Sequence, residues 1–151
     1  MQRIKVVEYT ATGILAFDLK DLLTALRAWG SDLAWSVFFL RAAGEDILHL
    51  ETISDTPHGM ALNWRELLAL GDRVTQTYDG IFVGCALGGT LPKHRGDGEI
   101  EIPDSCELVL EAVDSTYWVV AATEPGAIKA IQARFSHTEP YEPDGSTSRL
   151  W

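Results

Sequence analysis

The sequence predicts an α+β domain: a largely antiparallel sheet of about six to eight strands, with three helices mainly on one face. Two observations predict it. Hydrophobic residues make up 46% of the 151-residue chain, which is enough for a globular core. Segments in which apolar and polar residues alternate follow one another across short turns, as in β-hairpins, whereas the long crossovers that parallel strands require are few. The same pattern excludes a doubly wound dinucleotide-binding fold.

The first two predicted elements are a hairpin and a helix. Alternating apolar residues predict a hairpin over residues 4–16, with its turn at residues 10–13. Asp18 is a favourable N-cap for the helix, and Asp21 lies in the first turn, where a negative charge is stabilising. Gly30 is the expected stop. One apolar stripe is expected to face the sheet, formed by Leu19, Leu22, Leu23 and Leu26.

Two strands are predicted after this helix. The segment 34–41 is apolar on both faces, which is typical of a central strand. Alternation along it places Trp35, Val37 and Phe39 on the same face. After a turn, residues 47–53 alternate between apolar and polar side chains, which predicts a half-exposed strand.

A loop over residues 54–62 leads to the second predicted helix. Asn63 and Glu66 have the spacing of a capping box, in which each side chain bonds to the backbone of the other residue. The apolar pattern continues to Tyr78, and the turn-forming pair at residues 79–80 is expected to end the helix.

The second half of the chain is predicted to be mostly strands, with one final helix. That helix begins after Thr123 and has Pro125 in its first turn, a favourable place for proline. The predicted strands are residues 81–86, 99–102, 106–113 and 117–122. The inner side of the helix is predicted to be formed by Ala127, Ile128, Ile131 and Phe135.

The domain is expected to span residues 1–137. Residues 138–151 contain prolines, a glycine and a Ser/Thr cluster, which predict an irregular C-terminal tail. The tail ends in Trp151. This residue and the other aromatic side chains are the basis of one functional interpretation, a structural subunit of a homo-oligomer.

Two interpretations of Cys85 and Cys106 are open. Free cysteine packs as a small hydrophobe, and both residues lie in apolar segments, which favours two buried thiols. A disulfide requires the two strands to be neighbours, with Cα atoms within about 7 Å. Two cysteines at this spacing exclude a zinc ribbon, and the four histidines lack metal-ligand spacing. We therefore expect no metal and no cofactor.

The charge of the chain limits its partners. Twelve Lys and Arg against 22 Asp and Glu give a net charge of −10. Such a charge repels nucleic-acid phosphates and anionic membranes, and it permits a basic protein partner. The first residues lack the apolar core of a signal peptide, and no apolar run is long enough to cross a membrane. A cytoplasmic location is therefore expected.

An acidic block is the leading candidate for a functional site. No Lys or Arg occurs between Gly96 and Ile128. Alternation along the strands of this region places several carboxylates on one face. The predicted partner-binding residues are Glu99, Glu101, Glu107, Glu111 and Asp114. The leading hypothesis is a non-enzymatic protein-binding domain, similar to acidic immunity proteins in charge and size alone.

The alternative is a small enzyme or ligand-binding protein with a polar site between two loops. The first loop, residues 54–59, contains Asp55 and His58, a carboxylate and an imidazole of the kind that general acid–base catalysis uses. The second, residues 88–96, is rich in glycine but lacks the spacing of a nucleotide-binding phosphate loop. The ligand-binding candidates on it, suited to a small anion, are Lys93, His94 and Arg95.

Overall fold

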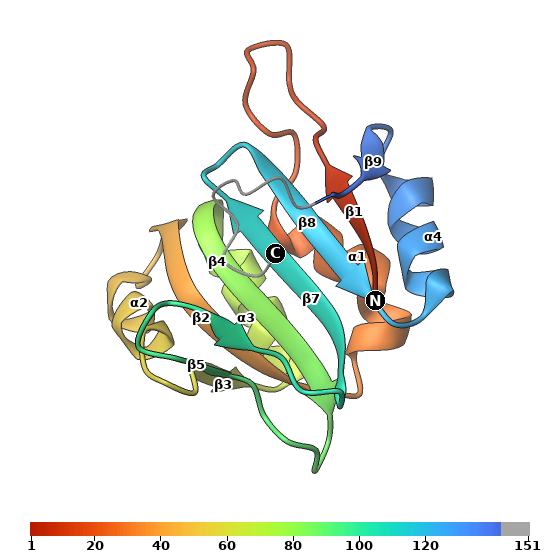
Figure 1. The fold of residues 1–151 in the computed structure, drawn as a ribbon. Coiled ribbons are helices and arrows are strands. Elements are labelled where there is room, and N and C mark those ends of the chain that lie inside the picture. The colour runs from red at the N-terminus through yellow and green to blue at the C-terminus, as the bar shows by residue number, and fades with distance from the viewer. Residues whose placement is uncertain (143–151) are drawn as a thin grey trace.

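A computed structural model of the protein describes residues 1–142, which form a seven-stranded antiparallel sheet and a separate two-stranded sheet (Figure 1). In their order across the large sheet, the strands are β3 (Met60–Leu62), β2 (Leu33–Gly44), β4 (Val74–Ala86), β7 (Cys106–Val113), β8 (Tyr117–Ala122), β1 (Gln2–Val6) and β9 (Thr138–Pro140). The small sheet consists of β5 (Lys93–His94) and β6 (Ile100–Glu101). We call the segment that carries it, residues 87–105, the ribbon. The predicted α+β class and largely antiparallel sheet are confirmed.

Four helices accompany the sheets in the described residues, one more than predicted. Three of them cover one face of the large sheet: α1 (Leu19–Gly30), α3 (Trp64–Arg73) and α4 (Pro125–Arg134) (Figure 1). The fourth, α2 (Leu48–Ser54), lies beside β2 (Figure 1). The predicted helix stripes are buried, and the main core contains Leu22, Leu26, Ile128 and Ile131 together with Trp35, Phe82 and Trp118 of the sheet.

Capping boxes start α1 and α3; the box at α3 confirms the prediction, and at α1 the predicted N-cap Asp18 also forms one. At α3 the Asn63 side chain accepts a hydrogen bond from the Glu66 N–H at 2.8 Å, and Glu66 accepts one from the Asn63 N–H at 3.0 Å. At α1, Asp18 and Asp21 form the same reciprocal arrangement. These bonds satisfy N–H groups that the first turn of a helix leaves without a partner.

The predicted strand over residues 47–53 is wrong, because this segment forms α2. Ile47, Leu50 and Ser54 follow helical spacing, and they pack toward the protein. The buried hydroxyl of Ser54 donates to the Glu51 carbonyl at 2.7 Å and accepts from the Leu40 N–H at 3.0 Å. In so short a segment the alternating and helical patterns coincide, and the contact with β2 decides between them.

The second predicted helix ends earlier than expected. α3 stops at Arg73, and residues 74–78, which are predicted to be helical, begin β4. Val74, Thr75 and Thr77 are β-branched, which favours extended backbone. The same segment pairs with the end of β2, so tertiary contacts reinforce this preference.

The predicted N-terminal hairpin is only partly formed. β1 pairs with β8 and β9, and the returning segment contributes a single bridge between Tyr9 and Leu15. The loop between β1 and α1 therefore projects from the body of the protein (Figure 1). Ile14 on this loop is 56% exposed.

A β-bulge in β2 changes which side chains share a face. Phe39 has a φ of 53°, and the pairing with β4 shifts its register at this point. As a result Leu40 joins Trp35 and Val37 in the core under the helices, whereas Phe39 packs on the opposite face. The expectation that Phe39 shares a face with Trp35 and Val37 is therefore wrong. The predicted central position of this strand is confirmed, because β3 and β4 flank it.

The ribbon lies over the sheet face opposite the helices (Figure 1). Ile100 and Ile102 of the ribbon pack there against an apolar cluster formed by Phe38, Ile81, Val83, Val109 and Ala121. At the base of the ribbon, Cys85 and Cys106 are partners in the β4–β7 pairing and form a disulfide. Of the two interpretations of the cysteines, the structure contains the disulfide.

β9 extends the sheet past residue 137, the expected end of the domain. It pairs with β1, and the Tyr141 N–H continues this pairing with a hydrogen bond to the Arg3 carbonyl at 3.4 Å. The first residues of the expected tail are therefore part of the sheet. Residues 143–151, including Trp151, lie outside the described residues. Within residues 1–142 no helix has both the length and the apolar run that crossing a membrane would need.

Candidate functional site

The two polar loops that the sequence predicts around a site are in contact. The backbone N–H of His94, on the ribbon, donates to the Pro57 carbonyl at 2.8 Å. The side chain of His94 reaches the carbonyl of Asp55, which is 39 residues away in the sequence. The fold therefore brings together one candidate residue from each loop.

The imidazole of His94 fills the junction between the loops. Its Nε2 lies 2.9 Å from the Asp55 carbonyl oxygen, and its Nδ1 lies 3.0 Å from the Arg95 carbonyl oxygen. The ring also contacts two aromatic rings of β2, with centroid distances of 5.1 Å to Phe39 and 6.4 Å to Phe38. The contact with Asp55 fastens one loop to the other, whereas the contact with Arg95 lies within the second loop.

The side chains of the other candidate residues of the two loops do not join this junction. His58 and Lys93 are exposed, and Lys93 lies opposite Glu101 in the small sheet. Arg95 forms an ion pair with Glu101 at 3.4 Å. Among the hydrogen bonds of residues 1–142, none connects the Asp55 carboxylate to His58, so the predicted acid–base pair is not assembled.

The Asp55 carboxylate instead holds Arg41 of β2. Two hydrogen bonds join them, at 2.8 Å and 3.1 Å. Hydrogen bonding to Asp55 raises the pKa of Arg41, and the negative charges of Asp55, Glu51 and Asp79 raise it further against the lowering effect of burial. Both side chains of the pair are more than 40% exposed, so the pair contributes little to stability.

Carboxylates gather around Arg41. Asp79 and Glu51 act on its charge, and Asp79 Oδ1 accepts a hydrogen bond from the Asp114 N–H at 3.0 Å. Leu48 is 81% exposed and lies one helical turn from Glu51 on α2. We define the α2 surface as Arg41 with the three carboxylates that act on its charge, Asp114 next to Asp79, and Leu48 on α2; the three carboxylates are Glu51, Asp55 and Asp79.

The predicted acidic block is divided between the ribbon and the large sheet. β6 pairs with β5 and not with β7, so Glu99 and Glu101 belong to the ribbon while Glu107 belongs to the large sheet. Glu111 is only 3% exposed, because β7 is a central strand between β4 and β8. The expectation that Glu111 is an open partner-binding residue is therefore wrong. Asp114, at the end of β7, belongs to the α2 surface.

Three residues of the α2 surface escape the sequence analysis: Leu48, Glu51 and Asp79. The predicted strand over residues 47–53 would place Leu48 and Glu51 on opposite faces, whereas in a helix residues three apart are neighbours. The signal that could reveal it is the inward spacing of Ile47, Leu50 and Ser54, which leaves Leu48 directed outward.

A carboxylate, a hydroxyl and an imidazole also meet where the sequence predicts no site. Glu8 Oε1 accepts hydrogen bonds from the Ser136 N–H at 2.8 Å and from the Ser136 hydroxyl, which lies 3.1 Å from His137 Nδ1. The bond from the Ser136 hydroxyl, followed by the bond from its N–H, lowers the pKa of Glu8. A lowered pKa makes a carboxylate a weaker base, so this group connects α4 to the end of β1 without activating Ser136.

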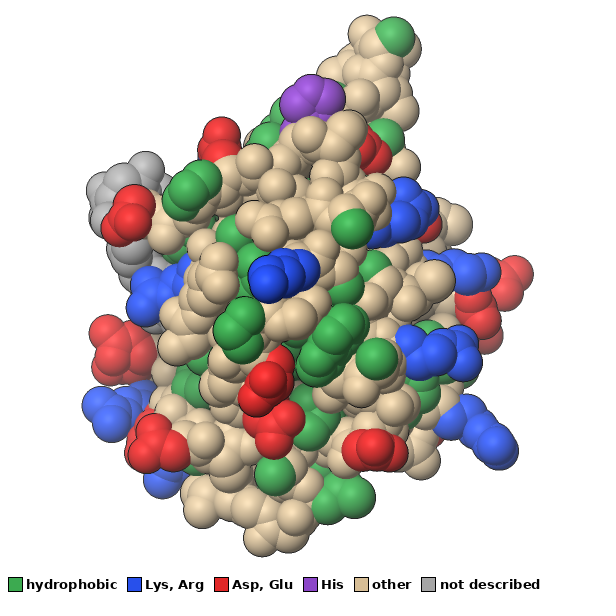
Figure 2. Space-filling model, turned by 90° about the vertical axis from the view of Figure 1, so that its right-hand side faces the viewer, with side chains coloured by type: hydrophobic (Ala, Val, Ile, Leu, Met, Phe, Trp, Pro, Cys, Tyr) green, Lys and Arg blue, Asp and Glu red, His purple; other side chains and the backbone are tan. Residues whose placement is uncertain are grey.

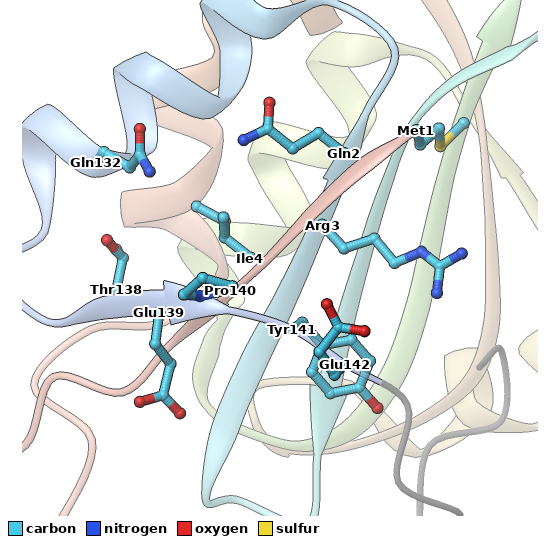
Figure 3. A pocket seen from close by; sticks show the side chains of 10 residues that line it. All are labelled: Met1, Gln2, Arg3, Ile4, Gln132, Thr138, Glu139, Pro140, Tyr141 and Glu142. Carbon is cyan, nitrogen blue, oxygen red and sulfur yellow. The ribbon is translucent and has the colours of Figure 1, made fainter.

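A cavity of about 450 Å³ lies at the β1–β9 edge of the sheet (Figure 3). Gln132 contributes to it from α4, and Gln2 and Arg3 contribute from β1 (Figure 3). The side chains of Gln2 and Arg3 point in different directions, as neighbours on a strand do (Figure 3). The polar groups therefore do not converge on one point, as a specific small-molecule site requires.

The face that carries α4 shows cationic and anionic side chains interspersed (Figure 2). In the part of the chain that the structure describes, no three His, Cys, Asp or Glu residues are grouped so that they could hold a metal ion.

Comparison with protein-family models, with curated proteins and with solved structures gave no match for this chain.

Proposed function

We propose that this chain is a non-enzymatic protein-binding domain that uses the α2 surface to bind a basic protein. The observation that carries the proposal is the grouping of three carboxylates around one guanidinium, with Asp114 next to one of them and an exposed leucine on α2. Four negative charges and one positive charge leave three negative charges on this surface. They are part of the net charge of −10, which steers a cationic partner toward the domain.

Leu48 supplies the apolar part of the proposed interface. Stable interfaces combine an apolar centre with a polar rim, and Leu48 is 81% exposed among the carboxylates of the α2 surface. Burying a leucine side chain against a partner contributes about 1.5–3 kcal/mol. The surrounding carboxylates determine orientation and the rate of association more than the affinity.

Arg41 keeps the α2 surface in a defined geometry. Its two hydrogen bonds orient the Asp55 carboxylate at the end of α2, and its charge lies between the charges of α2 and β4. This pre-organisation lowers the cost of ordering side chains when a partner binds. In charge and size, acidic immunity proteins that neutralise basic toxins are an analogy for such a domain.

The test compares two variants with the same change of charge. E51Q/D114N removes two carboxylates from the α2 surface, and asparagine tolerates the left-handed backbone of Asp114, which has a φ of 48°. E99Q/E124Q removes two exposed carboxylates elsewhere. Immobilised wild-type protein and both variants are used to capture partners from extracts of the source cells. The affinity of each captured protein is then measured by calorimetry at low and high ionic strength.

We expect E51Q/D114N to bind a captured partner at least about tenfold more weakly than E99Q/E124Q, because each close charge contact contributes roughly 1 kcal/mol or more. We also expect salt to weaken the wild-type complex. L48A is expected to weaken it without changing the salt dependence. Equal binding by the two charge variants, or binding that is insensitive to ionic strength, would rule out the α2 surface as the reason for binding.

A second candidate function is a small enzyme or ligand-binding protein with a polar site between the 54–59 and 88–96 loops. The contact between these loops at His94 favours it. A thermal-shift screen with small anions tests it on the wild type, H58A and K93A. A ligand that stabilises the wild type and neither variant supports this function, and a screen in which no anion stabilises the wild type contradicts it.

A cytoplasmic location remains an expectation within this proposal. Disulfides persist mainly in oxidising compartments, so the bond between Cys85 and Cys106 bears directly on it. Alkylation of thiols in intact source cells, followed by mass measurement, decides the question. Two alkylated cysteines support the cytoplasm, whereas an intact disulfide contradicts it. The homo-oligomer interpretation is tested separately by the mass of the protein in dilute solution.

A further inference from the structure

The two edges of the large sheet differ in how readily they accept another strand. β9 carries Glu139 and Pro140, and both a charge and a residue without an N–H discourage pairing at an edge. β3 forms the other edge, and its residues, Met60–Leu62, include neither a charge nor a proline. Among the described residues β3 pairs with β2 alone, so the N–H and C=O groups on its outer side point away from the sheet. This edge therefore offers the groups that hydrogen-bond an added strand.

A cavity of about 270 Å³ lies beside β3. Met60 and Leu62 line it from the strand, on the side of the sheet that carries the helices. Leu50 of α2 completes its apolar wall together with Ala69 and Leu70 of α3. Ala69 is exposed, so the cavity is open to solvent at α3. A strand added to β3 directs alternate side chains to this same side, where the cavity has room for one of them.

The charged residues at this cavity are mostly acidic. Glu66 lines it from α3 and is exposed. Arg73 also lines it, and its guanidinium donates to the backbone carbonyls of Glu45 and Asp46, two acidic residues that are themselves exposed. Three acidic residues and one basic residue give this group a charge of −2, within a chain of net charge −10. The cavity therefore favours an occupant that carries a positive charge beside its apolar side chain.

We propose that the edge of β3 binds an extended, cationic peptide segment of another protein by strand addition. One apolar side chain of this segment enters the cavity, and a Lys or Arg two positions away, on the same face, pairs with Glu66. Backbone hydrogen bonds to β3 supply affinity, and the cavity and the carboxylate supply specificity. The site is separate from the α2 surface, because Leu50 lines the cavity whereas Leu48 is directed outward. The inference therefore does not rest on the proposed function.

The test selects displayed random peptides of about seven residues, a typical strand length, on the whole chain. A69W fills the cavity with an indole, and A133W makes the same change at an exposed alanine of α4 that does not line the cavity. We expect the selected peptides to carry an apolar residue with Lys or Arg two positions away. Measured by calorimetry, they should bind A69W at least about tenfold more weakly than A133W, because burial of one large apolar side chain contributes that much.

Two further changes separate strand addition from other modes of binding. N-methylation of the peptide, one amide at a time, removes single donors, and in an added strand only alternate amides face β3. Binding should therefore weaken about tenfold at alternate positions and persist at the positions between them. E66Q removes a charge and keeps the helix start, because glutamine also fits a capping box. It should lower both the affinity and its salt dependence, whereas E124Q, at an exposed glutamate elsewhere, should change neither.

A measurement on the wild type decides the proposal even if A69W fails to fold. NMR spectra of ¹⁵N-labelled protein are recorded while a selected peptide is added. The backbone amides of β3 and of the helical residues that line the cavity should shift, and amides of β3 should exchange more slowly, because the added strand covers the edge. The amides of β9, at the opposite edge of the sheet, should not change.

Four results would overturn the inference. The first is a selection that yields no peptide for the wild type, or only peptides that bind A69W and A133W equally. The second is N-methylation without an alternating pattern, which would mean that the peptide does not bind as a strand. The third is a set of amide shifts that leaves out β3. The fourth is equal binding by E66Q and the wild type, which would rule out the cationic occupant.

Discussion

Asp18 and Thr77 are joined by two hydrogen bonds although 59 residues separate them in the sequence. Asp18 Oδ2 accepts from the Thr77 N–H at 2.8 Å, and Oδ1 accepts from the Thr77 hydroxyl. Oδ1 also accepts from the Leu19 N–H at 2.7 Å. One carboxylate therefore starts α1 and also fixes the first part of β4.

Replacing Asp18 by alanine removes the cap of α1 and leaves the Thr77 backbone without its acceptor. We expect D18A to lower the free energy of unfolding by about 2–4 kcal/mol, the sum of a lost cap and an unsatisfied donor. Urea denaturation measures it. D32N, at an exposed aspartate beyond the end of the same helix, should change this free energy by less than about 0.5 kcal/mol. A D18A loss no larger than that of D32N would show that the carboxylate does not connect α1 to β4.

Gly59 adopts a backbone conformation that a side chain would disrupt. Its φ is 66°, and an added Cβ would lie 2.5 Å from the Val37 carbonyl oxygen. We expect G59A to lower the free energy of unfolding by about 1–3 kcal/mol, because neither strand can move without breaking the β2–β3 pairing. Gly96 has no atom within 4 Å of an added Cβ, so G96A is the matched control. Thermal melts in which the two variants lose equal stability would contradict this prediction.

The disulfide at the base of the ribbon should contribute substantially to stability. Cys85 and Cys106 are 21 residues apart, and linking them restricts the unfolded chain. We expect the C85A/C106A double variant to lose about 2–4 kcal/mol of unfolding free energy in urea without reductant. Adding reductant should destabilise the wild type toward the variant and leave the variant unchanged. A reductant effect of equal size on both proteins would point to a cause other than this bond.

Glu8 should make stability depend on pH in acid. Hydrogen bonds from Ser136 lower the pKa of Glu8 below its ordinary value of 4.5, so the folded state favours the charged form. Its contribution is therefore complete above the pKa of the unfolded chain, and it is lost as the pH falls through the lower pKa of the folded state. E8Q should remove this component, which is less than about 1 kcal/mol for an accessible group.

The measurement for Glu8 is the free energy of unfolding between about pH 3 and pH 7, because carboxylates change charge in the acidic part of this range. E124Q, at an exposed glutamate with no capping hydrogen bond from its side chain, is the control and should keep the wild-type acid limb. If E8Q and wild type lose stability in parallel on acidification, the Ser136 contacts do not lower this pKa.

Elements with strong local signals could be predicted from the sequence. The capping pairs Asp18/Asp21 and Asn63/Glu66 mark helix starts, because a helix leaves its first N–H groups unsatisfied wherever it lies in the fold. Long apolar alternation likewise predicted β7 and β8. The segment 47–53 has no cap hydrogen bond from a side chain and fits both periods, so only its packing beside β2 makes it helical.

The candidate sites likewise include one that could be predicted from the sequence and one that could not. The two polar loops could be predicted as a pair because both are glycine-containing or polar segments next to strands, and the fold brings Asp55 and His94 into contact. The arrangement of the acidic block could not be predicted, because it depends on which strand β6 pairs with, and the possible partners are distant in the sequence. The bulge at Phe39 also has no sequence signal.

By itself the sequence determined the fold class, the helix caps, the inward faces of α1 and α4, and the acidic charge of this protein. These properties depend on contacts within one or two turns or on composition, so neighbouring residues are sufficient to specify them. The tertiary structure alone decided the order of the strands, the helix at residues 48–54, the burial of Glu111 and the grouping of carboxylates around Arg41. Each of these is a choice among long-range partners of similar local preference, and only the packing of the whole core selects one of them.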